Sequence, residues 1–119
     1  MVTVRSFRDL IAWQRAMDLA QGVYEATRTW PREEVYGLTA QVRRAAVSVM
    51  ANIAEGKGRT GSREFLHHLS IADGSLAEVE SHLLLAQRLG FLDDVILEPL
   101  AHQIEETRSL IRGLIRSLR

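Results

Sequence analysis

The chain has 119 residues, of which 46% are hydrophobic and 25% charged, and its formal net charge is zero. This length predicts one domain with a sizeable core, and the composition is ordinary for a soluble globular protein. The absence of cysteine excludes disulfides, thiolate metal sites and cysteine nucleophiles. Residues 1–6 carry no apolar signal segment, and no apolar run approaches the ~18 residues of a membrane span, so we expect a cytoplasmic protein.

The first predicted helix opens at Ser6 and Asp9, which have the spacing of a capping box. Side chains three and four residues apart then define the face that we expect to enter the core. These are Leu10, Trp13, Met17, Ala20, Tyr24 and Thr27. Trp30 should end this stretch, because a residue that precedes proline avoids the α region.

The second predicted helix covers about residues 38–55, and Gly56 suits a left-handed C-cap. Its core stripe is apolar and consists of Leu38, Val42, Ala46, Val49 and Ile53. A second stripe, about 120° away at 100° per residue, is polar and consists of Gln41, Arg44, Ser48, Asn52 and Glu55.

A third stripe on the same helix is again apolar. It consists of Ala40, Val47, Met50, Ala51 and Ala54. A bundle helix needs only one buried face, and an extra alanine-rich face indicates close approach by another helix. Because the chain has no fifth helix, we predict that a second subunit covers this stripe. A central helix buried deeply in a monomer, or scattered surface apolar residues, would give the same pattern.

The third predicted helix starts near Ser62, a good N-cap residue, and ends at Gly90. Its apolar heptad positions are Phe65, Leu69, Ala72, Leu76, Val79, Leu83 and Ala86. The fourth follows Asp93 and Asp94, with Pro99 expected in or near its first turn, where a missing N–H costs little. Its apolar positions are Leu100, Ile104, Thr107, Ile111, Leu114 and Leu118.

Four amphipathic helices with short connections predict an all-α protein. We expect an antiparallel up-down-up-down four-helix bundle that forms a single domain over residues 1–119. Three helices with a swapped arm are the alternative arrangement.

The sequence offers little catalytic chemistry. Glu64 and His67 have the Glu-x-x-His spacing of di-iron bundles, but those sites need a second such motif and two further glutamates. Glu78 and His82 are spaced as a surface pair at i,i+4. A P-loop, a zinc-protease motif, a nucleophile elbow and a dinucleotide-binding glycine pattern are all missing. We therefore predict no enzyme, no catalytic residue, no metal and no cofactor.

Two groups of cations could contact nucleic-acid phosphates. The first lies around the second helix and the loop after it, and the second lies along the fourth helix. Their members are Arg43, Arg44, Lys57, Arg59 and Arg63, and Arg108, Arg112 and Arg116, joined by Arg119. Codon bias in a GC-rich genome explains the excess of arginine equally well.

Three segments together carry a family resemblance. FRDLIAWQRAMDLA (residues 7–20), YGLTAQVRRAAVSVMANIAEGKGR (36–59) and FLHHLSIADGSLAEVESHL (65–83) resemble the four-helix-bundle family of bacterial proteins first noticed in intervening sequences of large-subunit ribosomal RNA genes. The resemblance implies a ring-shaped homopentamer and no assigned biochemical function. It identifies as family positions Gln41, Arg43, Arg44, Asn52, Glu55, Gly56, Gly58 and Arg59. Their implied role is structural, at the end of the second helix and at the seam between subunits.

Two hypotheses about function follow. The first is a non-enzymatic scaffold that assembles with itself as a homopentamer and binds another protein. The second is a nucleic-acid-binding accessory protein that acts through its arginines. This second hypothesis comes from a related branch of the family, the accessory protein of diversity-generating retroelements. That relationship implies a reverse transcriptase as partner. A ferritin-like enzyme comes third, and neither main hypothesis involves a membrane.

Overall fold

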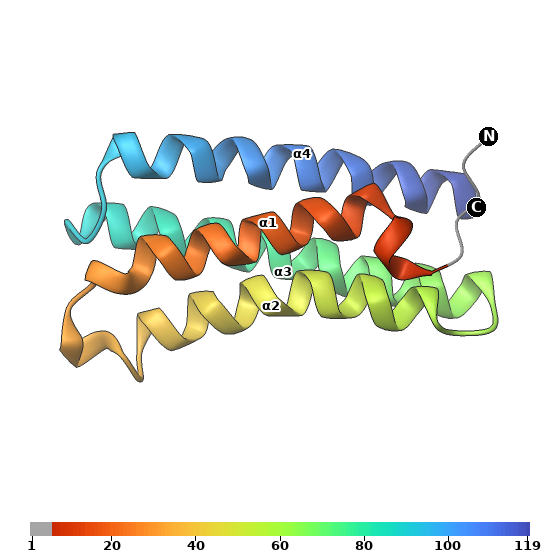
Figure 1. The fold of residues 1–119 in the computed structure, drawn as a ribbon, viewed down its shortest axis with the longest axis horizontal. Helices are drawn as coiled ribbons and strands as arrows, with labels where there is room; N and C mark the ends of the chain where they lie inside the picture. Colours follow the sequence, from red (N-terminus) through yellow and green to blue (C-terminus); the bar gives the residue numbers. More distant parts are fainter. Residues whose placement is uncertain (1–5) are drawn as a thin grey trace.

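The computed structural model describes residues 6–119. It contains the helices α1 (Ile11–Ala26), α2 (Leu38–Lys57), α3 (Ser62–Arg88) and α4 (Asp94–Leu118), and the short 3-10 turns η1 (Phe7–Asp9), η2 (Thr27–Thr29) and η3 (Arg32–Glu34). Each helix runs back along the one before it, and α4 returns to lie beside α1 (Figure 1). The predicted all-α four-helix bundle is confirmed. Over residues 6–119, no helix combines the length and the apolar character needed to cross a bilayer.

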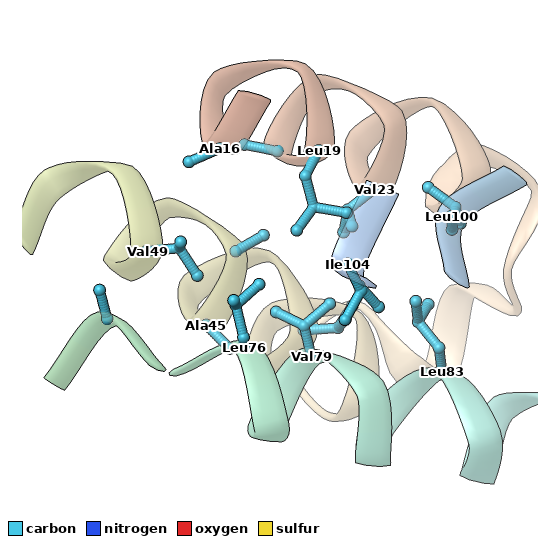
Figure 2. Close-up of a cluster of buried hydrophobic side chains, with 14 of the residues drawn as sticks. Ala16, Leu19, Val23, Ala45, Val49, Leu76, Val79, Leu83, Leu100 and Ile104 are labelled. Carbon is cyan, nitrogen blue, oxygen red and sulfur yellow. The ribbon is translucent and has the colours of Figure 1, made fainter. Parts of the chain in front are cut away.

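The core is a column of aliphatic side chains to which all four helices contribute (Figure 2). Leu19, Val49, Leu76 and Ile104 come from α1, α2, α3 and α4, and each is at most 1% exposed. Fully burying one such side chain stabilises the fold by roughly 1.5–3 kcal/mol. The predicted core stripe of α2 is buried throughout, and the predicted stripes of α3 and α4 are buried or partly buried throughout.

The predicted core face of α1 was right at Leu10, Ala20 and Thr27, which are buried, and wrong at Tyr24. The residues of α1 that the bundle buries are Ala12, Ala16, Leu19, Ala20 and Val23. Trp13 and Met17 lie at the edge of the core, and Tyr24 is 42% exposed. Alanines occupy the inner face because they let α1 approach its neighbours closely. The larger rings pack beside it instead, as when Trp13 meets Phe7 edge to face at 5.1 Å.

Gly56 does not cap α2 in a left-handed conformation, so that prediction was wrong. The helix continues through Gly56 to Lys57, and its C-cap is Gly58, with φ −76°. Within residues 6–119, only Gly90 has a positive φ, at 80°, and it ends α3 as predicted. There the Phe91 N–H donates to the Ala86 carbonyl at 2.9 Å, the pattern of a Schellman motif.

The other helix ends agree with the sequence in part. Ser6 and Asp9 form the predicted capping box. It caps the start of η1, however, and α1 begins only at Ile11. Asp93 caps α4 by accepting the Ile96 N–H at 3.1 Å. Pro99 lies beyond the first turn, inside α4.

Pro99 therefore deprives the Val95 carbonyl of its helical partner. Because Val95 and Pro99 are both exposed, water can take that place. At the start of α3, Ser62 is the first helical residue and Gly61 is the N-cap, so the predicted side-chain cap is not formed.

Candidate functional site

The polar stripe of α2 lies against α3 and forms a hydrogen-bonded seam. The Asn52 side-chain amide donates to the Ser48 carbonyl at 2.9 Å and to Ser48 Oγ at 3.0 Å. Ser48 Oγ lies 2.9 Å from Ser75 Oγ on α3. Asn52 Oδ1 lies 3.0 Å from His68 Nδ1, also on α3. Two side chains of α2 thus join two of α3 across one seam.

This arrangement determines which ring nitrogen of His68 carries a proton. The Asn52 amide nitrogen is committed to Ser48, so the oxygen that faces His68 can only accept. The proton must therefore sit on His68 Nδ1, and Nε2 takes no part in the seam. Asn52 thus bonds the backbone of its own helix and reaches across the seam with its oxygen.

The two helices approach each other closely at Gly56. A Cβ atom added there would lie 2.7 Å from His68 Cβ and 3.0 Å from a ring carbon of Phe65. Real Cβ atoms do not tolerate the first distance, and His68 Cβ is anchored to the backbone of α3. Gly56 therefore sets the separation between α2 and α3.

Just beyond this point, Arg59 turns back to α2. Its Nη2 donates to Glu55 Oε1 at 2.7 Å, and its Nε lies 4.0 Å from Glu64 Oε2. The hydrogen bond from Arg59 lowers the pKa of the Glu55 carboxyl, and the charge of His68 adds to the effect. All three partners of these ion pairs are about half exposed, so the pairs contribute little to stability.

Toward the other end of the seam, the surface is hollowed between α2 and α3. The hollow has a volume of about 300 Å³. Its lining residues are Gln41, Arg44, Ala45, Ser48, Ser75, Glu78 and His82. The sequence placed Glu78 and His82 together as a surface pair, but no ion pair joins them in the described chain.

Sequence reasoning missed the α3 side of this hollow. Ser75, Glu78 and His82 have the spacing of one helical face, and this signal was available. Their meeting with Gln41 and Arg44 depends on the register of two antiparallel helices, which the sequence pattern does not specify.

The apolar stripe of α2, predicted as an oligomer interface, lies largely outside the bundle. Ala51 is exposed, and Ala40, Val47 and Ala54 are partly exposed. Met50 differs from them, because it packs against the core of its own chain. All five residues are at least partly exposed, and their contact with a second subunit stays a prediction.

Arg43 and Arg44 are neighbours in sequence but serve different helices. Arg43 Nε donates to Thr27 Oγ1 at 2.8 Å, and its guanidinium lies 4.5 Å from the centre of the Tyr24 ring. Arg43 thus fastens α2 to the end of α1, whereas Arg44 lines the hollow beside α3. The predicted first group of cations is divided between two sides of α2.

Two arginines of the second cationic group form ion pairs with carboxylates of the same chain. Arg108 bonds Glu80 at 3.0 Å and also bonds Glu105, and Arg112 lies 3.5 Å from Asp73. Burial lowers the pKa of Arg108, but the hydrogen bonds and charges of the two glutamates outweigh burial and raise it overall. Of the predicted cationic residues within 6–119, ion pairs are lacking at Arg43, Arg44, Lys57, Arg63, Arg116 and Arg119.

Residues 6–119 contain no group of three or more histidine, aspartate or glutamate side chains placed to hold a metal ion. Glu64 and His67 are both exposed, and Glu64 faces Arg59.

The geometry defines a helical-bundle protein whose distinctive feature is a polar seam between its second and third helices. The family model described as 23S rRNA-intervening sequence protein matches residues 8–113. The chain therefore belongs to this family, as the resemblance indicated. No match is found among curated proteins.

Proposed function

We propose that this protein is a non-catalytic module that assembles with itself into a ring of five subunits. The observation that carries the proposal is the small-residue apolar face of α2, centred on the exposed Ala51. Val47 and Ala54 flank it and are only partly covered by their own chain. Methyl groups at helical spacing let a second helix approach closely, and burying them removes apolar surface from water. The number of subunits in the proposed ring, five, comes from the homopentamer that the family resemblance implies.

Such a ring would serve as a scaffold for a protein partner. Nucleic-acid binding ranks second, because salt bridges already engage Arg59, Arg108 and Arg112 within the chain. Phosphate contact by these side chains would have to compete with those carboxylates. A pull-down from native lysate, with and without nuclease, separates the two candidates. Loss of the partner on nuclease treatment would support the nucleic-acid reading, with a reverse transcriptase among the expected companions.

Ala51→Glu tests the interface directly. A carboxylate buried between subunits without a partner is costly, so we expect the variant to dissociate while its helical circular dichroism is unchanged. Ala77→Glu is the matched control, because Ala77 is an exposed alanine on α3. Val47→Glu should behave like Ala51→Glu. If light scattering finds the same mass for Ala51→Glu as for the unmodified protein, α2 is not the interface.

A further inference from the structure

We propose that the hollow between α2 and α3 binds a small zwitterion of the size of a free α-amino acid. Arg44 would take the carboxylate of this ligand, and Glu78 its ammonium group. Every residue that lines the hollow belongs to one chain, although Arg44 lies next to Ala40 and Val47 of the apolar stripe.

The first argument comes from counting hydroxyl hydrogens. Ser48 and Ser75 have two such hydrogens, and their mutual hydrogen bond at 2.9 Å uses one. Ser48 Oγ also accepts from Asn52, so it can donate to Ser75 or accept twice. In either case, one hydroxyl hydrogen of the pair has no acceptor within residues 6–119. Both serines line the hollow, and Ser75 is only 5% exposed. A hydroxyl donor that lines the hollow without a protein acceptor favours a ligand that carries an acceptor oxygen.

The second argument is the charge of the walls. Arg44 and Glu78 line the same hollow, yet no ion pair within 4.0 Å joins them in the described chain. Glu78 would repel a simple anion, and Arg44 would repel a simple cation. A ligand with both a negative and a positive group can pair with Arg44 and with Glu78 at the same time. Gln41 and His82 add an amide and an imidazole that can bond either end of the ligand.

The third argument is size and polarity. A volume of about 300 Å³ is at the small end of ligand sites and suits a molecule of a few heavy atoms. Ala45 supplies the one apolar side chain among the lining residues, so a large apolar group would find little contact. We therefore expect small polar amino acids such as L-serine to bind better than L-leucine or L-phenylalanine.

A titration of the isotopically labelled full-length protein with L-serine, followed by NMR, tests the proposal. We expect saturable shifts at the Arg44 side-chain Nε–H and at the amides of Ser75 and Glu78. Acetate and methylammonium each carry one of the two charges and should bind at least about ten-fold more weakly. Equal or tighter binding of acetate or inorganic phosphate would overturn the zwitterion assignment. Absence of saturable shifts with L-serine would overturn the site itself.

Three variants locate the contacts. Arg44→Gln and Glu78→Gln should each weaken L-serine binding about ten-fold or more, and Ser75→Ala should weaken it less. Arg88→Gln is the control, because it removes an exposed arginine of α3 that does not line the hollow. Thermal melts of each variant verify folding, and the exposed Arg44 and Glu78 should tolerate substitution. Unchanged binding in folded Arg44→Gln and Glu78→Gln would contradict the proposal.

Discussion

Asn52 makes three hydrogen bonds, to the carbonyl and the hydroxyl of Ser48 and to His68. Each partner lies on the seam between α2 and α3, so the amide holds both helices at once. Removing the Asn52 amide leaves its partners, Ser48 and His68, partly buried without these hydrogen bonds. Polar groups left unsatisfied in this way destabilise the folded state.

We therefore expect Asn52→Ala to lower the free energy of unfolding by about 1–3 kcal/mol in chemical denaturation. Gln41→Ala is the control, because Gln41 is exposed and makes no side-chain hydrogen bond within residues 6–119. Equal stability of the two variants would show that the network does not hold the helices together.

Glu55 gives a prediction about pH. Its pKa is lowered in the folded protein, chiefly by the hydrogen bond from Arg59. A carboxyl with a lowered folded pKa stabilises the protein above its ordinary pKa of 4.5, and this contribution disappears as the pH falls through the folded pKa. Glu55→Gln should therefore melt slightly below the unmodified protein at neutral pH, and the difference should vanish in acid. A difference that persists in acid would contradict this origin.

Arg59→Ala should cause the same small loss of stability at neutral pH that we expect for Glu55→Gln. If Arg59 acted on nucleic acid instead, its removal would leave the melting temperature unchanged. The salt dependence of nucleic-acid binding would then weaken by about one phosphate contact.

At the scale of helices, the contact of α2 with α3 depends on a glycine. Gly56→Ala would place a methyl group 2.7 Å from His68 Cβ and push the helices apart. We expect it to destabilise the fold by about 1–3 kcal/mol, the usual effect of overpacking. Gly74→Ala is the matched control, because Gly74 lies inside α3 with no atom within 4 Å of the added carbon.

Without crowding, the change from glycine to alanine should stabilise the helix, by about 0.5–1 kcal/mol. The two variants should thus shift the denaturation midpoint in opposite directions. A stabilising Gly56→Ala would mean that the helices separate at no cost.

The helices differ in how much of their packing could be predicted. In α3 the predicted heptad positions from Leu69 to Ala86 are all buried, while Ile71, Leu84 and Leu85 lie outside that stripe and are exposed. In α1 the pattern of large side chains pointed to Trp13 and Tyr24, while the buried contacts are made by alanines such as Ala16. Alanine contributes little to an apolar pattern, yet it is the residue that permits close helix contact.

The seam shows a second limit. The polar stripe of α2 was visible in the sequence, but its neighbour was not. A glycine near a helix end reads equally well as a cap or as a point of close contact, and only His68 on α3 decides between them at Gly56. The hollow likewise needs α2 and α3 side by side before Arg44 and Glu78 share it.

For the whole molecule, charge is balanced both in total and locally. The formal net charge is zero, and carboxylates of the same chain engage Arg15, Arg59, Arg108 and Arg112. A balanced surface gives little long-range attraction for a polyanion. The small-residue face of α2, together with the family resemblance, is why we place self-association first.

Size-exclusion chromatography with multi-angle light scattering on the unmodified protein at micromolar concentration tests this central claim most directly. We predict a single species with five times the 13.4 kDa mass of one chain. The mass of one chain would contradict self-association, and any other multiple would contradict a ring of five.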